Sequence, residues 1–177
     1  MLAAAALALG SSYAVANPPH FDISAQDFRQ QWNEVVAQVA HGGGAHVTSA
    51  LQLGGLGAAP ADALASPGGW RARCGNGDVM TFSADTPQQT FALLRIDSAA
   101  VGLYAGPQRI APCVLWSMKI LQPALTQQQV EALAVQLLRG ANAANSQSEA
   151  RAAGVIYHLS SDAQGGLHFS AQAGGAP

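Results

Sequence analysis

The chain has 177 residues and a formal net charge of −2, and its charged residues form no long run of either sign. Hydrophobic residues make up 49% of the chain and charged residues only 10%, against about 25% in typical soluble proteins. This length and composition predict one globular domain of ordinary size, and they give no indication of a nucleic-acid backbone or an anionic membrane as a partner.

The N-terminus, MLAAAALALGSSYAVANPP, has the features of an export signal that is later removed. Its apolar run at 2–9 is too short to span a bilayer, which takes about 20 apolar residues, whereas a secretory signal needs a core of roughly 7–15. The small residues A-V-A at 14–16 suit a cleavage site. No Lys or Arg precedes the run, so an Ala-rich first helix is the alternative, although the run lacks a polar face. We predict that 1–16 is a signal peptide with an incomplete n-region and that the protein is periplasmic or secreted.

The chain contains two cysteines, Cys74 and Cys113. An even number in an exported chain favours one disulfide, and this one would close a loop of about 40 residues, worth roughly 4 kcal/mol in the chain-entropy model. The two residues are too far apart for C-x-x-C redox chemistry, and no His/Cys pair has zinc-finger spacing. We predict a structural disulfide, with two buried thiols or a metal pair as the alternatives.

The first predicted helix covers residues 21–41, with Ser24 as its N-cap and the HGGG sequence at 41–44 as its end. Its apolar side chains form one stripe at i, i+4, i+7, i+8 and i+11, which indicates a face packed on a core: Phe28, Trp32, Val35, Val36 and Val39.

Four strands are expected next, at 46–53, 70–74, 78–83 and 91–97, with a small-residue loop at 54–69. The sequence G-N-G at 75–77 favours a hairpin between the second and third of these strands, because Asn-Gly accepts the positive φ of a type I′ turn.

The chain then becomes helical. A mostly apolar helix is predicted at 113–121, with Pro112 near its start. The T-x-x-Q sequence at 126–129 forms a capping box and predicts a second helix that ends at Gly140. The polar, small-residue segment at 141–154 is predicted to be a linker, and two final strands are expected at 155–161 and 167–171.

This order, α-β-β-β-β-α-α-β-β, predicts an α+β fold. An antiparallel sheet of about five to six strands would carry the N-terminal helix and the central helical pair on one face. The domain is expected to cover 17–173, followed by a flexible tail at 174–177. The predicted disulfide between Cys74 and Cys113 would join a hairpin to the helical layer.

No strong catalytic motif is present: the chain lacks H-E-x-x-H, G-x-S-x-G and G-x-x-x-x-G-K-[ST]. His158 and His168 lie on the final predicted hairpin, where diagonal positions on one face are about 7–8 Å apart. That spacing is marginal for one metal ion, so we expect solvent-facing histidines and predict no catalytic, cofactor or metal set. Asp97, near Arg95 or Arg109, is the acid most worth inspection, with a surface or turn role as the simpler interpretation.

We therefore predict a small exported bacterial protein that acts by binding another protein, such as an inhibitor, an immunity-type factor or an envelope accessory factor. The alternatives are a hydrolase that uses His158 or His168 with a nearby acid or Ser, and a structural component of the envelope. We expect no cofactor, no nucleic-acid partner and no stable membrane insertion after signal removal. The sequence leaves the oligomeric state open.

Overall fold

A computed structural model describes residues 19–41, 52–53, 70–74, 78–85, 90–98 and 110–174. The predicted signal peptide, the loop at 54–69 and all of the predicted tail except Gly174 lie outside these residues. The elements follow the order α1 (Ala25–His41), β1 (Gln52–Leu53), β2 (Trp70–Cys74), β3 (Asp78–Ala84), β4 (Leu93–Ser98), α2 (Ala111–Leu121), α3 (Gln127–Gly140), β5 (Gln147–Ala152), β6 (Val155–Ser161) and β7 (Leu167–Ala173).

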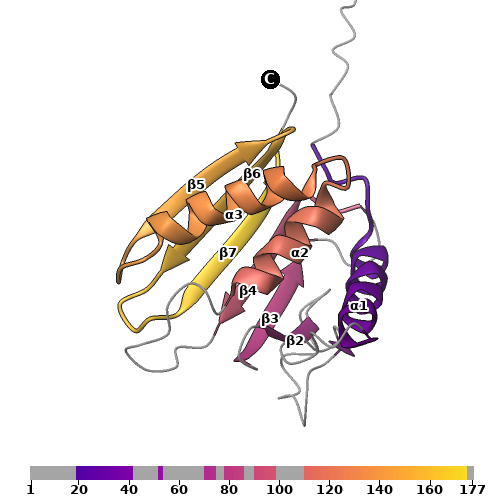
Figure 1. Cartoon of the computed structure of the whole chain (residues 1–177), viewed down its shortest axis with the longest axis horizontal. Coiled ribbons are helices and arrows are strands. Elements are labelled where there is room, and N and C mark those ends of the chain that lie inside the picture. Colours follow the sequence, from indigo (N-terminus) through magenta and orange to yellow (C-terminus); the bar gives the residue numbers. More distant parts are fainter. Residues whose placement is uncertain are drawn as a thin grey trace, which may run out of the picture.

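The described strands form one sheet of seven, in the order β1-β2-β3-β4-β7-β6-β5, and every neighbouring pair is antiparallel. The first four strands follow the chain as a meander, whereas β7 inserts between β4 and β6. In Figure 1, α2 and α3 cross one face of the sheet, and α1 stands beside α2. The α+β fold with helices on one face is confirmed, with seven described strands where five or six were predicted.

The largest difference from the predicted order is β5. The segment at 141–154 is not a linker throughout, because Gln147–Ala152 pairs with β6 and forms an edge of the sheet. Ala150 is the only residue of β5 that is buried. A strand with one exposed face and one free edge needs few apolar side chains, so the sequence lacks the alternation that identifies a half-buried strand.

Both predicted helix caps are confirmed. At the start of α1, the Ser24 hydroxyl accepts a hydrogen bond from the backbone N–H of Asp27 at 3.1 Å. At the start of α3, Thr126 and Gln129 form a capping box in which each side chain accepts from the other residue's backbone N–H. The predicted hairpin is confirmed as well, since β2 and β3 pair antiparallel up to Cys74 opposite Asp78.

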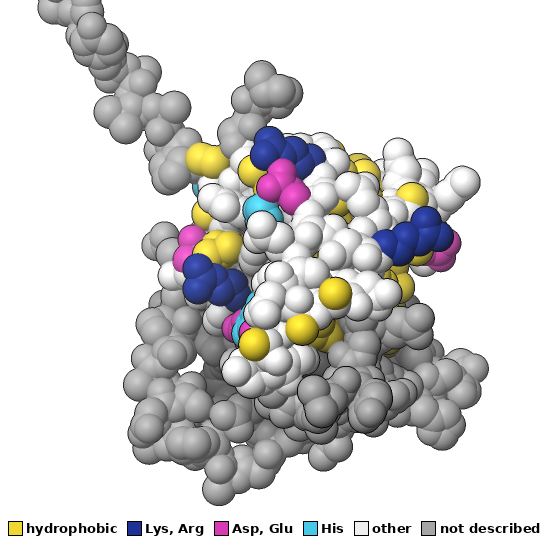
Figure 2. Space-filling view, turned by 90° about the vertical axis from the view of Figure 1, so that its left-hand side faces the viewer, with side chains coloured by type: hydrophobic (Ala, Val, Ile, Leu, Met, Phe, Trp, Pro, Cys, Tyr) yellow, Lys and Arg dark blue, Asp and Glu magenta, His cyan; other side chains and the backbone are white. Residues whose placement is uncertain are grey.

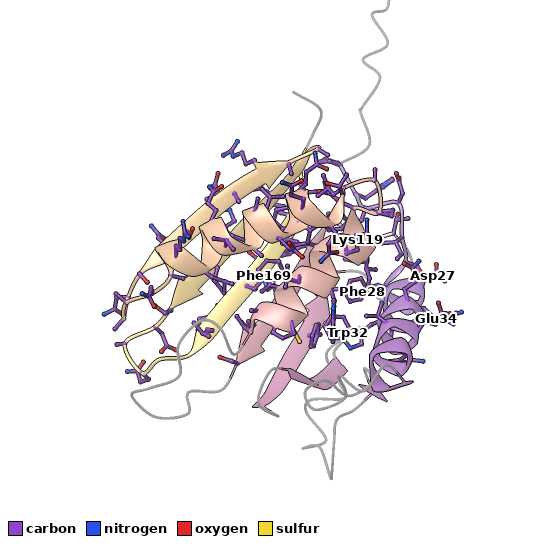
Figure 3. All side chains as sticks on the ribbon, viewed as in Figure 1. Asp27, Phe28, Trp32, Glu34, Lys119 and Phe169 are labelled. Atoms are coloured by element: carbon purple, nitrogen blue, oxygen red, sulfur yellow. The ribbon has the colours of Figure 1, made fainter. Side chains whose placement is uncertain are left out.

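An aromatic cluster connects α1 to the rest of the fold. Trp32 is fully buried, with its ring centroid 4.9 Å from that of Phe82 on β3 and 5.7 Å from that of Trp116 on α2. In Figure 3, Phe28 and Trp32 point from α1 toward the body of the molecule, while Asp27 and Glu34 lie on its outer side. Phe28 and Trp32 of the predicted apolar stripe are therefore core residues, whereas the side chains of Val36 and Val39 lie outside the described part of the chain.

The two cysteines lie on elements that contact each other. Cys74 is the last residue of β2, Cys113 lies in the first turn of α2, and these two elements are in contact. Cys113 is fully buried and is not a free thiol. The side chain of Cys74 lies outside the described residues, so its pairing with Cys113 stays a prediction. Within the described ranges, no helix combines the length and the apolar character needed to cross a membrane.

Candidate functional site

The face of the sheet opposite the helices is polar. Along β7, alternate residues Leu167, Phe169 and Ala171 are buried toward the helical layer, while His168 and Gln172 are exposed. The strands β4 and β6 alternate in the same way, because successive side chains of a strand point to opposite faces. We call this surface the open face; it comprises the outward side chains of β4, β7, β6 and β5, namely Leu93, Arg95, Asp97, His168, Ser170, Gln172, Ile156, His158, Ser160, Gln147, Glu149 and Arg151.

A histidine held between two carboxylates is the most organised feature of the open face. Asp97 on β4 stands directly opposite His168 on β7 in the sheet register. The Nδ1 of His168 lies 2.8 Å from Oδ1 of Asp97, and its Nε2 lies 3.3 Å from Oδ2 of Asp162. All three side chains are partly exposed, at 45% for His168, 45% for Asp97 and 38% for Asp162. Both ring nitrogens of His168 are therefore occupied at a solvent-facing position.

The β6–β7 turn positions Asp162. The carboxylate oxygen Oδ1 accepts hydrogen bonds from the backbone N–H of Gln164 at 2.9 Å and of Gly166 at 2.7 Å. The backbone N–H of Asp162 in turn donates to the carbonyl of Gly166 at 2.9 Å. A Cβ atom at Gly166 would collide with the Asp162 carboxylate, so a larger residue there would displace this carboxylate from its present position. With Oδ1 engaged by the turn, Oδ2 is left facing the imidazole.

The two carboxylates favour the charged form of His168. The hydrogen bond to Asp97 raises the pKa of His168 above its ordinary value of 6.5; partial burial opposes this rise and the contact with Asp162 adds to it. The pKa of Asp162 is lowered from its ordinary value of 3.8, first by the backbone hydrogen bond from Gly166. The arrangement therefore stabilises an imidazolium between two carboxylates.

A second charged group lies on the neighbouring strands β5 and β6. The Nε of Arg151 donates to Oε1 of Glu149 at 2.6 Å, and Nδ1 of His158 lies 3.6 Å from Oε2 of Glu149. The hydrogen bond from Arg151 is the main reason that the pKa of Glu149 is lowered. On the side of the molecule drawn in Figure 2, charged side chains occur in small mixed groups on a largely uncharged surface.

The predicted diagonal placement of the two histidines on one sheet face is confirmed, and the two rings contact different carboxylates. His158 stands opposite Ser170, and His168 opposite Ser160, so the histidines occupy diagonal positions on one face. His158 contacts Glu149, whereas His168 contacts Asp97 and Asp162. The described part of the chain contains no group of three or more His, Cys, Asp or Glu residues that could hold a metal ion.

Asp97 was singled out for inspection from the sequence, and its observed partner is His168. The sequence suggested Arg95 or Arg109 as its neighbour, and Arg109 lies outside the described residues. The two residues of the pair are 71 positions apart, and they meet only because β7 inserts beside β4. The sequence carries no local signal for that strand order. Asp162 was missed for a different reason: its role depends on the conformation of the β6–β7 turn.

Two shallow pockets lie beside the β5–β6 turn, away from the His168 group. Their volumes are about 300 and 380 Å³, and they share Ala153, Gly154, Val155 and Gly174 in their walls. The smaller is lined in addition by Arg151, and the larger by a set that includes Gln122. Neither pocket is lined by the residues of the His168 group, whose three side chains are each partly exposed.

The chain matches no family model, no curated protein and no solved structure in the comparisons made with each.

Proposed function

We propose that this is an exported binding protein whose open face contacts another protein, as an inhibitor, an immunity-type factor or an envelope accessory factor would. The observation that carries the proposal is the fixed, exposed Asp97–His168–Asp162 group on a polar sheet face. Hydrogen-bonding groups that are already held in place lose little conformational freedom on binding, which favours association. The partner we expect has a polar contact surface with both signs of charge, complementary to this mixed one.

The same geometry supports binding more than hydrolysis. A His that acts as a general base for a nucleophile needs one ring nitrogen within hydrogen-bond reach of that nucleophile. In His168 one nitrogen is 2.8 Å from Asp97 and the other 3.3 Å from Asp162, and no described hydroxyl or thiol is hydrogen-bonded to the ring. An Asp–His pair with no nucleophile bonded to the ring among the described residues is poorly suited to acyl transfer.

Affinity capture followed by quantitative binding tests the proposal. The mature, oxidised protein is used to capture a partner from its own cell envelope, and the purified partner is titrated against open-face variants by calorimetry. We expect Arg95→Ala and Asp97→Asn to weaken binding about tenfold or more, as loss of a contact in an interface does. The matched control, Glu131→Gln on the helical face, should bind as the wild type.

Two results would contradict this function. The first is a partner whose affinity is unchanged by both open-face variants. The second is turnover of a substrate in a panel of esters, peptides and glycans, lost in His168→Gln, which would favour the hydrolase.

Export and the disulfide belong to the same proposal. The short apolar run, the A-V-A site and the even number of cysteines support both. N-terminal sequencing of the protein from the periplasm or medium should begin at Asn17, and a chain that retains 1–16 in the cytosol contradicts export. For Cys74 and Cys113, the intact mass after alkylation should shift only when reductant is added. Two thiols that alkylate in the native protein rule the bridge out.

A further inference from the structure

The outer edge of β5 is a free backbone edge with a defined hydrogen-bond pattern. Just before the start of β5, the carbonyl of Ser146 accepts from the backbone N–H of Ser161 at 2.9 Å, which makes these two residues a hydrogen-bonded pair. In an antiparallel ladder such pairs alternate with non-hydrogen-bonded ones. The alternation makes three pairs of the β5–β6 register non-hydrogen-bonded: Gln147↔Ser160, Glu149↔His158 and Arg151↔Ile156.

It follows that Gln147, Glu149 and Arg151 turn their backbone N–H and C=O groups away from β6. One observation confirms this direction: the side-chain amide of Gln136 on α3 reaches over the edge and donates to the carbonyl of Glu149 at 3.0 Å. No other described residue is hydrogen-bonded to the outward backbone groups of Gln147, Glu149 and Arg151, so these groups can pair with an additional strand.

We propose that β5 pairs antiparallel with β5 of a second copy of this chain, about a two-fold axis that passes through Ala150. In this register Glu149 stands opposite Arg151 of the other copy, and Arg151 opposite its Glu149. Both residues turn their backbone groups outward, so each of these pairs can exchange two N–H···O=C bonds. The result is one sheet that continues from one copy into the other.

The charges of β5 select this register. Glu149 and Arg151 lie on the same face and already contact each other at 2.6 Å within one strand. Across the two-fold axis they form an alternating square of two acids and two bases, which is favourable because opposite charges directly across two strands attract. Pairing centred on Glu149 or on Arg151 would instead place like charges opposite each other, which is destabilising.

The residue on the axis fits as well. Ala150 would face its own copy as a non-hydrogen-bonded pair, in which the two Cα atoms approach to about 4.5 Å. Ala150 is 3% exposed beneath the helical layer, and its small side chain suits this close approach. Gln136 must release the Glu149 carbonyl for all of the bonds to form, so we expect a weak dimer rather than an obligate one.

Charge reversal in the oxidised full chain tests the dimer. Sedimentation equilibrium at low salt should show the mass of two chains at high concentration. The exposed substitutions Glu149→Arg and Arg151→Glu should each weaken association about tenfold or more, and the double variant, which restores opposite charges, should recover it to within about threefold. Glu131→Arg on α3 is the matched control and should self-associate as the wild type does.

Amide exchange gives a second measurement that does not depend on substitution. The outward N–H groups of Glu149 and Arg151 should exchange more slowly as the protein concentration rises, because pairing removes them from water. A monomeric wild type at about millimolar concentration overturns the proposal, since weak interfaces of this size still associate there. The proposal is also overturned if the double variant associates as weakly as the single variants, or if amide exchange at Glu149 and Arg151 does not change with protein concentration.

Discussion

At the scale of single residues, the buried amide of Gln122 shows how a polar side chain can hold two parts of a fold together. Its Nε2 donates to the carbonyls of Ala152 at 2.8 Å and Ala153 at 3.1 Å, and its Oε1 accepts from the hydroxyl of Tyr157 at 2.9 Å. Gln122 is 7% exposed and Tyr157 is fully buried, and burial raises the pKa of the Tyr157 hydroxyl. The amide therefore connects the end of α2 to the β5–β6 hairpin, with its bond to Tyr157 buried and its bonds to the two carbonyls part-buried.

We predict that Gln122→Ala destabilises the protein by about 3 kcal/mol, because it leaves a buried hydroxyl and two carbonyls without their partner. Tyr157→Phe removes only one hydrogen bond and should cost about 1 kcal/mol. Urea denaturation of both variants measures the difference. Equal losses in the two variants would mean that the amide contributes no more than its bond to Tyr157.

The His168 group predicts a defined pH dependence. The folded-state pKa of His168 is raised above its ordinary value of 6.5, so its contribution to stability is fully present below that pH and is lost as pH rises through the folded-state pKa. The pKa of Asp162 is lowered from 3.8, so its contribution is present above that pH and is lost as pH falls through the folded value. The group therefore stabilises the fold most between these two ordinary values.

To test this, the free energy of unfolding of the wild type is compared with that of His168→Gln from about pH 4.5 to 9. The difference between the two should be constant at the acidic end of this range and should shrink above neutrality. The matched control is Gln172→Ala, an exposed substitution on the same strand and face that removes no titratable group, and its difference from wild type should not change with pH. A difference for His168→Gln that grows with rising pH would have the wrong sign for an imidazolium held by carboxylates.

At the scale of elements, the β5–β6 turn carries a residue in an unfavourable conformation. Ala153 has φ of 44° and Gly154 has φ of 79°, the positive pair that a two-residue type I′ hairpin requires. Glycine adopts this region freely, but alanine does so at a cost of roughly 1–2 kcal/mol. Elsewhere among the described residues, a non-glycine positive φ of 56° is found at Asn145, a residue type that tolerates it.

We predict that Ala153→Asn stabilises the protein by about 0.5–1 kcal/mol, because asparagine relieves this strain while the backbone carbonyl that Gln122 contacts is retained. Ala144→Asn, at an exposed turn position without positive φ, is the control and should change stability little. The measurement is the shift in thermal midpoint. A lower midpoint for Ala153→Asn would show that the turn conformation is not what limits stability there.

The elements that could be predicted from the sequence are those whose signals are local. The buried positions Phe28 and Trp32 on α1 and the capping box at Thr126 depend on neighbours within a few residues, and the sequence predicted both. The strand β5 could not be predicted in this way, because an edge strand with one buried side chain, Ala150, looks like a polar linker. The candidate site could not be predicted because its contacts are not local. Asp97 meets His168 only through the β4–β7 pairing, which is a property of the whole sheet.

At the scale of the molecule, aromatic side chains of α1 pack against both the sheet and α2. Trp32 lies between Phe82 of the sheet and Trp116 of α2, so one side chain contacts both layers. Phe28 adds an edge contact to Phe91, with ring centroids 6.1 Å apart. Lys119, at the other end of α2, donates to the carbonyl of Pro123 at 2.9 Å and so fixes the path into α3. The helical layer thus depends on α2 as the element between α1 and α3.

This arrangement predicts that Trp32→Ala destabilises the whole protein rather than α1 alone. Removal of a fully buried indole leaves a cavity against both the sheet and α2, and such substitutions cost about 3–5 kcal/mol. Glu34→Ala, on the outer side of the same helix in Figure 3, is the matched control and should cost less than about 0.5 kcal/mol. Urea unfolding followed by far-UV and near-UV circular dichroism distinguishes the two cases. We expect one cooperative transition that is shifted to lower urea, because the cavity weakens the contact between the sheet and the helical layer. If α1 packed only loosely on the fold, Trp32→Ala would leave the main transition in place and would remove helical signal in a separate, earlier step.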